Sequence, residues 1–246
     1  TGGRAALGLR FSDATKATLG ADYQANKHTL RTGMGATAES YSSKVRTEDA
    51  NFRNYGLFGE LTHYLNDRDK LIGGLRADHW NAQDKRATLS IGTGMAATTV
   101  ANPSANKERS ATLSSGFGRY EHDLAAMPAT FYAGIGHTER FPDYWELISA
   151  TKESATTLSA FDSRPEKTNQ FDIGLVYNSG KMSASLSGFY SKINDYLMVQ
   201  SNYTKAALMG MGTRTAAIVR NVNASTWGGE AGIAYALADA WKVDAT

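Results

Sequence analysis

Apolar and polar residues alternate along much of this chain. In the run 55–64, Leu57 and Leu61 fall on one face and Glu60 falls on the other. Successive side chains of a β-strand point to opposite sides, so this alternation predicts strands with one apolar and one polar face. The same pattern recurs in the runs 17–24, 71–78, 170–178, 183–191 and 230–237. The chain is therefore predicted to be all-β and antiparallel, with about nine strands and the start of a tenth at Trp241.

The two faces of the predicted strands suit two different architectures. The polar face is rich in Gly, Ser and occasional charge, and the apolar face often carries an aromatic residue near one end. A transmembrane β-barrel needs an apolar outside, a polar inside and aromatic residues at both interfaces, because lipid offers no hydrogen bonds to an unpaired backbone. The strands of a soluble antiparallel sandwich also alternate. The strand pattern by itself leaves both architectures open.

The connections between the predicted strands favour the barrel. Tight turns are predicted near 12–14, 66–69, 178–180 and 238–240, with a slightly longer one at 122–129. Between the turns lie four long polar stretches, at 25–53, 81–110, 139–168 and 199–226. This strict alternation is unusual in a globular domain and typical of bacterial barrels, which have short periplasmic turns and long extracellular loops. Since an odd, open set of strands cannot close, we expect residues 1–246 to be part of a larger barrel.

Composition narrows the possible function classes. Against 26 Lys and Arg stand 24 Asp and Glu, and these charges form no basic stripe, so nucleic acid is not an expected partner. The absence of Cys excludes disulfides, thiol catalysis and Cys-ligated zinc. No run approaches the roughly 20 apolar residues that a membrane helix requires. The residues from Thr1 onward show neither an initiator Met nor the profile of a signal peptide, so we expect a piece of a longer protein.

Four segments in the second half of the chain resemble the barrel of TonB-dependent outer-membrane receptors. They are GIGHTERFP at 134–142, RPEKTNQFDIG at 164–174, SGFYSKINDYL at 187–197, and RNV at 220–222 followed by GGE at 228–230. Each motif is weak alone, but all four occur in the order found in that family. The resemblance implies that residues 1–246 belong to the C-terminal barrel domain, embedded in outer-membrane lipid and lacking the last strands.

Within that family the chain is most similar to the copper receptors. The similarity rests on GRYEHDL at 118–124, HTERFPDYWEL at 137–147 and the MGM segment at 209–211. It implies a barrel of about 22 strands, copper captured by extracellular loops and plug, and import driven by contact between the plug and the TonB complex. The plug and the Cys that forms part of the principal site in copper receptors are absent from these residues.

Met209 and Met211 are the candidate metal ligands. They lie two apart in a segment of small and apolar residues, 206–212, and if that segment is extended both thioethers point to the same side. Soft sulfur suits Cu(I), although two methionines at an apolar loop tip can also simply pack. Since copper receptors carry methionines in their extracellular loops, the resemblance makes this pair a candidate copper relay. Met34 and Met95 lie in other predicted loops and are not assigned to the relay.

The remaining polar residues give no catalytic pattern. The five histidines lack metal-binding spacing, and the chain contains no G-x-S-x-G or Walker motif. Glu60, Asp78 and Glu230 are predicted to face the lumen beside Arg76, where salt bridges are more common than glycoside hydrolysis. The aromatic stretch from Arg140 to Trp145 is predicted to mark a strand exit at the outer interface, or else to line an entrance.

The sequence thus predicts a transporter that carries out no bond-making chemistry and holds no catalytic cofactor. Copper is the predicted cargo. A receptor for a siderophore or another metal chelate is the alternative within the family, and its loops would use aromatics and Arg instead of Met. An outer-membrane enzyme or adhesin barrel, and a soluble carbohydrate-binding β protein, are the alternatives from other classes.

Overall fold

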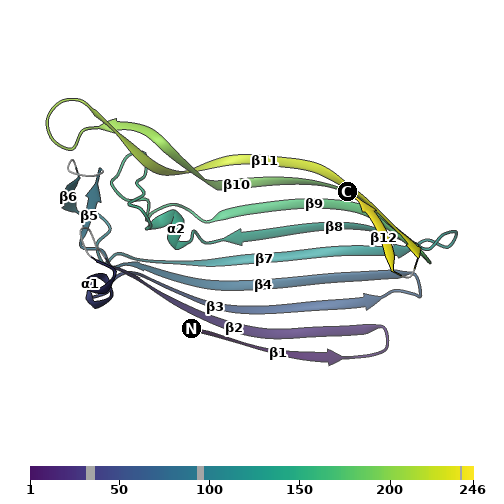
Figure 1. The fold of residues 1–246 in the computed structure, drawn as a ribbon. Coiled ribbons are helices and arrows are strands. Elements are labelled where there is room, and N and C mark those ends of the chain that lie inside the picture. Colours follow the sequence, from purple (N-terminus) through teal and green to yellow (C-terminus); the bar gives the residue numbers. More distant parts are fainter. Residues whose placement is uncertain (32–36, 93–96, 239) are drawn as a thin grey trace.

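One curved sheet of ten antiparallel strands makes up most of the molecule (Figure 1). The computed structural model describes residues 1–31, 37–92, 97–238 and 240–246. The strands of this sheet, in spatial order, are β1 (Gly2–Arg10), β2 (Thr15–Leu30), β3 (Thr47–Tyr64), β4 (Asp69–Asp84), β7 (Glu108–Asp123), β8 (Ala129–Arg140), β9 (Glu166–Ser179), β10 (Met182–Ala206), β11 (Thr213–Ala238) and β12 (Trp241–Ala245). The predicted antiparallel meander of nine to ten strands is confirmed. Its two edges, β1 and β12, are not joined to each other.

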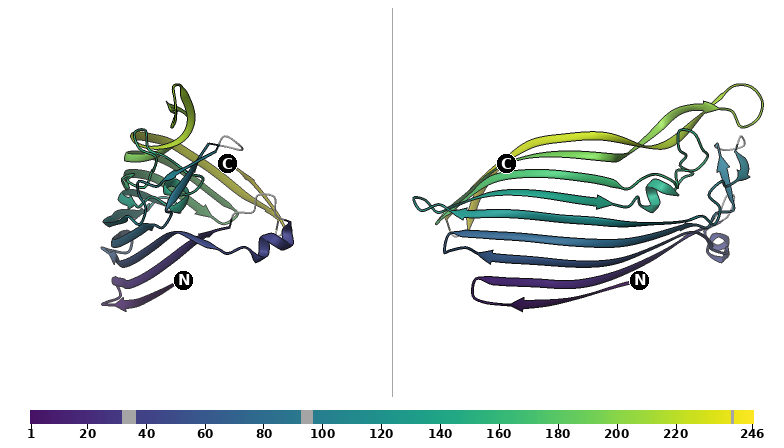
Figure 2. Two further views of the ribbon diagram at one scale, coloured as in Figure 1. Left: turned by 90° about the vertical axis from the view of Figure 1, so that its left-hand side faces the viewer. Right: turned by 180° about the vertical axis from the view of Figure 1, so that it is seen from behind.

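Smaller elements gather at the end of the sheet where the long connections lie, which we call the loop end. They are the helices α1 (Ala38–Ser43) and α2 (Tyr144–Leu147) and a two-stranded sheet of β5 (Thr88–Ile91) and β6 (Thr98–Ala101). In the described part of the chain, the connections at the opposite end, the turn end, are short (Figure 2). At one of these turns the Asn66 side chain accepts hydrogen bonds from the backbone N–H groups of Arg68 and Asp69. Such a side-chain turn lets the chain reverse direction within four residues.

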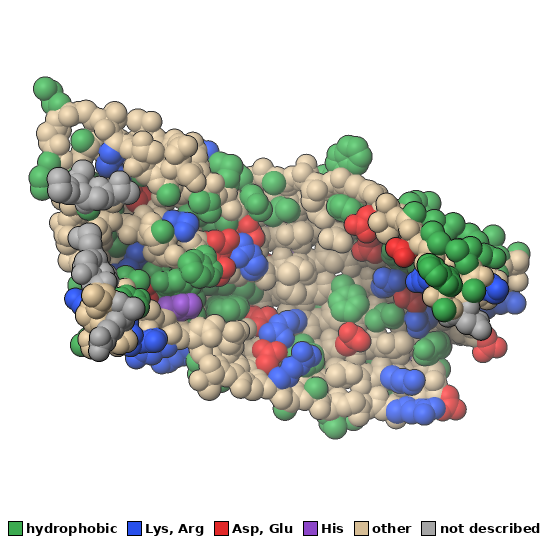
Figure 3. All heavy atoms as spheres, viewed as in Figure 1, with side chains coloured by type: hydrophobic (Ala, Val, Ile, Leu, Met, Phe, Trp, Pro, Cys, Tyr) green, Lys and Arg blue, Asp and Glu red, His purple; other side chains and the backbone are tan. Residues whose placement is uncertain are grey.

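The two faces of the sheet are as different as the alternation predicts. Many outward side chains are large, apolar and exposed, with Leu57 66% and Leu75 77% exposed, and within the described residues no second layer covers them. The hollow face carries acidic and basic side chains in groups (Figure 3). A sandwich would bury its apolar face against a second sheet. The exposed leucines are therefore the arrangement expected of a wall that meets lipid on one side and water on the other.

The apolar belt on the outward face runs obliquely to the strands. Directly paired outward positions form a row that begins at Leu19 on β2, passes Leu75 on β4, and ends at His137, Asn169 and Lys192 on β8, β9 and β10. The same row is thus apolar at one side of the sheet and polar at the other. Strands of a barrel tilt by roughly 35–45° to the membrane normal. A row of directly paired positions therefore changes depth from strand to strand, from the lipid core to the polar interface.

The strands are longer than the sequence pattern predicts, and the predicted long loops are correspondingly shorter. The actual loops are 31–46, 85–107, 141–165 and 207–212, in place of 25–53, 81–110, 139–168 and 199–226. The difference is largest for the last stretch, where β10 and β11 extend as a twisted hairpin well beyond the rest of the sheet (Figures 1 and 2). Short and long connections still alternate, and Pro103, Pro128, Pro142 and Pro165 all lie outside strands.

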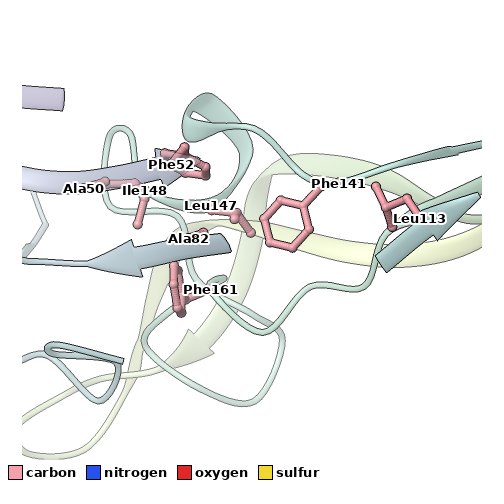
Figure 4. Close-up of a cluster of buried hydrophobic side chains, with 8 residues drawn as sticks. All are labelled: Ala50, Phe52, Ala82, Leu113, Phe141, Leu147, Ile148 and Phe161. Atoms are coloured by element: carbon pink, nitrogen blue, oxygen red, sulfur yellow. The ribbon is translucent and has the colours of Figure 1, made fainter. Parts of the chain in front are cut away.

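A compact apolar cluster lies at the loop end on the hollow side of the sheet (Figure 4). It joins three strands to the loop that precedes β9 through the buried residues Ala50, Phe52, Ala82, Leu113, Phe141, Leu147, Ile148 and Phe161. Because four of these residues belong to the loop 141–165, the cluster fixes that loop against the wall. In the described part of the chain, none of the helices is both long and apolar enough to span a membrane.

Candidate functional site

The methionine pair lies at the tip of the β10–β11 hairpin. Met209 is 77% exposed and Met211 is fully exposed, so neither packs into the protein. The segment between the strands is a turn and not an extended stretch, because Gly210 and Gly212 have φ angles of +76° and +119°, and the N–H of Ala207 donates to the carbonyl of Gly212 at 3.0 Å. The condition under which strand geometry would align the two thioethers is therefore not met, since Gly210 between them turns the backbone.

Exposure leaves both sulfur atoms available to an incoming soft metal ion. Met34 and Met95 lie outside the described residues. Among the residues that the structure describes, no group of three His, Asp or Glu side chains could hold a metal ion. His28, which the sequence placed in a long loop near Met34, lies on β2, and its ring stacks on that of Tyr144 with centroids 3.9 Å apart. The structure thus keeps Met209 and Met211 as neighbours at a tip and adds no described histidine to them.

A single carboxylate holds the hairpin that carries the methionines. Glu153, from the loop 141–165, is 2% exposed. Its carboxylate accepts hydrogen bonds from Lys205 Nζ at 2.7 Å and from both terminal nitrogens of Arg214 at 2.6 and 2.7 Å. Because Lys205 on β10 is paired directly with Arg214 on β11, one side chain ties both strands of the hairpin to the loop.

The backbone around Glu153 strengthens this connection. Its N–H donates to the carbonyl of Ala217 at 3.0 Å, and its carbonyl accepts from the N–H of Val219 at 2.8 Å, so the residue forms a parallel bridge with Ile218. Burial would raise the pKa of the Glu153 carboxyl, but hydrogen bonds and charge attraction from Arg214 and Lys205 outweigh it and hold the pKa below its ordinary value. The carboxylate therefore stays charged at neutral pH.

A second buried carboxylate, Asp84, organises the loop 85–107 that contains β5 and β6. Asp84 has no exposed surface and accepts hydrogen bonds from Arg86, Asn102 Nδ2 at 2.9 Å and Ser104 Oγ at 2.7 Å. Arg86 also donates to the carbonyl of Ile148 at 2.9 Å, and the hydroxyls of Ser104 and Ser159 lie 2.7 Å apart. This network joins the end of β4, the loop 85–107 and the loop 141–165 into one assembly.

The stretch from Arg140 to Trp145 is only partly exposed, because Phe141 and Pro142 are buried and Tyr144 is half-buried. Phe141 is buried and stacks on Trp80 with centroids 5.9 Å apart. Tyr144 donates to Asp49 Oδ2 at 2.6 Å, and burial together with this acceptor raises the pKa of Tyr144 to about 12. Trp145 is exposed. The prediction of a strand exit is correct, because β8 ends at Arg140, but the prediction that these aromatics sit in the membrane interface is wrong for Phe141 and Tyr144.

The hollow face of the wall carries fixed ion pairs. Arg76 donates to Asp22 at 2.7 and 2.9 Å and to Asp78 at 2.6 Å, and Asn54 donates to the same Asp78 at 2.8 Å. The predicted salt bridge between Arg76 and Asp78 on the lumen side is therefore confirmed. Sequence reasoning missed Asp22 as the second partner, because its contact with Arg76 crosses two strand pairs.

Comparison with known proteins places this geometry in a family. The family model described as "TonB dependent receptor-like, beta-barrel" matches residues 1–246. No curated protein sequence matches the chain. Among solved structures, the copper transporter OprC is similar with a TM-score of 0.84 and 42% sequence identity, over 99% of this chain and 36% of that one.

Two further structures share the fold at much lower identity. One is the Serratia marcescens hemophore receptor HasR, solved with its hemophore HasA and heme, at 17% identity and a TM-score of 0.69 over 98% of this chain and 39% of that one. The other is the FrpB iron transporter of Neisseria meningitidis, at 16% identity and a TM-score of 0.61 over 95% of this chain and 32% of that one. The chain spans between about a third and two fifths of these three relatives.

Proposed function

This chain belongs to the family of TonB-dependent receptor-like β-barrels, and from that premise we propose that it forms part of the wall of an outer-membrane receptor that imports copper. One observation carries the choice of cargo, namely 42% identity to a copper transporter over 99% of this chain. The hemophore receptor HasR and the iron transporter FrpB share less than 20% identity with this chain and support the fold alone.

The loop end has the features that metal capture needs. Met209 and Met211 expose soft sulfur at the outermost point of the β10–β11 hairpin, and thioethers prefer Cu(I) to harder ions. Two exposed thioethers make a weak, exchangeable site, which suits a relay that passes an ion inward better than a site that retains it. In this proposal the ion moves on to stronger ligands outside these residues, and import is driven through the plug and the TonB complex.

Replacing both methionines with leucine tests the relay in the full-length receptor. Leucine keeps the size and apolar character of the side chain but removes the sulfur, so Met209→Leu with Met211→Leu is expected to slow copper uptake several-fold at limiting copper. Met127→Leu is the matched control, because Met127 is also exposed but lies in a tight turn at the turn end. Uptake is measured as cell-associated copper over time.

Uptake measurements with copper and with a ferric siderophore distinguish a wrong relay from a wrong cargo. Unchanged uptake in the double variant at limiting copper contradicts the relay and leaves copper as cargo intact. Uptake of a ferric siderophore, with no uptake of copper, contradicts the cargo itself and supports the receptor for a metal chelate. A receptor that imports neither and hydrolyses or adheres to a substrate contradicts the transporter.

A further inference from the structure

A continuous apolar groove crosses the outward face of the wall. Its lower part, of about 710 Å³, lies over β2, β3 and β4 between Leu19, Leu61 and Leu71. Its upper part, of about 610 Å³, lies over β7, β8 and β9 beside Ile135. The two parts meet at Leu75, which lines both. Both parts are shallow and open, and both lie on the surface that faces lipid.

The groove exists because several outward positions lack side chains. Gly59, Gly73, Gly116 and Gly118 all point outward, and strand pairing sets them next to one another, with Gly59 opposite Leu75, Leu75 opposite Gly116, and Gly73 opposite Gly118. A Cβ built on Gly118 meets no heavy atom within 4 Å, and one on Gly73 meets only the carbonyl oxygen of Phe117 at 3.4 Å. The floor at these two positions is therefore open space that a larger side chain would fill.

The upper end of the groove is polar and carries positive charge. Ser114, His137 and Asn169 line it. Lys192 is paired directly with Asn169, so it lies on the same face beside this end, and it is exposed. Within the described part of the chain Lys192 has no hydrogen-bond or ion-pair partner. Lys167 lies diagonally across from it on β9, a position that is typically about 7–8 Å away.

The local charge balance at this end is positive. Glu139 pairs with Lys167 and lies near His137, with its carboxylate 3.2 Å from Lys167 Nζ and 3.5 Å from His137 Nε2. One carboxylate therefore faces two lysines at this end, and the positive charge of Lys192 has no counter-charge there. Trp227 and Tyr190 come two residues nearer the turn end on the same face, so the cations lie just outside an aromatic interface row. Phosphate groups of lipids lie at that depth.

We propose that this surface binds one phosphorylated lipid of the outer leaflet, with an acyl chain in the groove between Leu75 and Ile135 and a head-group phosphate at Lys167 and Lys192. The apolar groove accounts for the chain, and the uncompensated positive charge at its polar end accounts for the phosphate. The proposal concerns the lipid-facing side of the wall and is independent of which cargo the receptor carries.

Filling the groove tests the acyl-chain half of the proposal. The full-length receptor is placed in nanodiscs with hexa-acylated, bisphosphorylated lipid A, and bound lipid is counted by native mass spectrometry. Gly73→Leu with Gly118→Leu is expected to reduce retained lipid A about tenfold or more. Gly188→Leu is the control, since Gly188 also points outward on β10, outside the groove, and a Cβ there meets only the Gly228 carbonyl oxygen at 3.8 Å.

Removing the cations tests the phosphate half. Each surface Lys is worth about 1 kcal/mol toward an anionic membrane, so Lys167→Gln with Lys192→Gln is expected to weaken lipid A binding roughly 10- to 30-fold. Lys181→Gln, at the turn end, is the control. Wild-type receptor is expected to retain lipid A over its dephosphorylated form, and the lysine double variant is expected to lose this preference.

The outcomes that overturn the proposal are distinct. Equal retention of phosphorylated and dephosphorylated lipid A by the wild-type receptor contradicts the proposed phosphate site. Equal retention of lipid A by the variant Gly73→Leu with Gly118→Leu and by Gly188→Leu contradicts the proposed acyl-chain site. A change from dimer to monomer in the groove variant, with lipid content unchanged, assigns the groove to a second copy of the barrel and also overturns the proposal.

Discussion

Glu153 shows how much of the loop end depends on one side chain. Its carboxylate neutralises Lys205 and Arg214, which lie on two different strands and are themselves mostly buried. Nothing in the sequence around Glu153 marks it, because its side-chain partners are 52 and 61 residues away. Sequence reasoning can place a residue in a loop, but it cannot tell which distant cations that loop will meet.

Glu153→Gln is expected to loosen the contact between the loop 141–165 and the β10–β11 hairpin without opening the sheet. The amide keeps the shape of the side chain but leaves two buried cations uncompensated, at a cost of about 3–5 kcal/mol. Hydrogen exchange at the amides of Glu153 and Val219, whose bonds join the two segments, is expected to rise, while exchange in β3 and β4 stays unchanged. Unchanged protection at both amides would contradict the role of the ion pairs.

The same contact has a defined pH dependence. The pKa of Glu153 is lower in the folded protein than its ordinary value of about 4.5. A lowered folded pKa means that the ion pairs contribute fully above about pH 4.5 and that this contribution is lost as the pH falls through the lowered value. Exchange at Val219 in wild type is therefore expected to rise on acidification below that range, and in the Gln variant it is expected to be high throughout.

The methionine pair and Phe141 mark the limits of residue-level prediction. The sequence correctly places Met209 and Met211 at a loop tip, because small residues and glycines surround them. It leaves the backbone of this tip open, and the structure shows that Gly210 turns the chain there. Phe141 was predicted at the lipid interface from its neighbours in sequence, but tertiary contacts with Trp80 and Leu147 bury it.

At the scale of elements, the sequence predicts the strands correctly inside the membrane and underestimates them outside it. Alternation requires an apolar environment on one side, and a transmembrane strand needs only about 9–11 residues to cross. The outer halves of β10 and β11 contact the loop 141–165 on one side, where Lys205 and Arg214 meet Glu153, and runs such as Gln200 to Thr204 lack the alternation. Hydrogen bonds between the two strands keep them paired where the hydrophobic pattern no longer indicates a strand.

The two-stranded sheet β5–β6 was not predicted, and Asp84 explains why it is held in place. We expect Asp84→Asn to detach the loop 85–107 from the wall, because Arg86 loses its buried counter-charge and one of the two oxygens that accept from Arg86, Asn102 and Ser104 becomes a donor. Limited proteolysis of the full-length receptor in detergent is expected to cut within this loop in the variant at least several times faster than in wild type.

A control separates this effect from general unfolding. Asp162→Asn removes a carboxylate that is paired with Lys107 in the same region but is exposed, and exposed pairs contribute at most about 1 kcal/mol. Its cleavage pattern is expected to match wild type. Equal protection of the loop in the Asp84 variant would show that the Asp84 carboxylate is not what holds it.

At the scale of the whole molecule, one physical condition accounts for what the sequence could predict. A wall between lipid and water imposes the same two-residue period on every strand, so class, strand order and alternating connections all follow from local pattern. The loop assembly obeys no such condition. Its buried carboxylates and aromatics meet across long sequence separations, and each contact has to be observed.

The same condition predicts how residues 1–246 behave when they are expressed alone. Within the described residues, β1 pairs only with β2 and β12 only with β11, so each leaves a row of backbone groups open to any other strand. The outward face also exposes leucines such as Leu57 and Leu75 that only lipid or detergent would cover. The isolated chain is therefore expected to aggregate in water and to show no monomer by size-exclusion chromatography with light scattering. The full-length receptor in detergent is the control. A water-soluble monomer with a sharp, detergent-free unfolding transition would mean that the outward leucines tolerate water, and the interpretation of this surface as a lipid-facing wall would then be wrong.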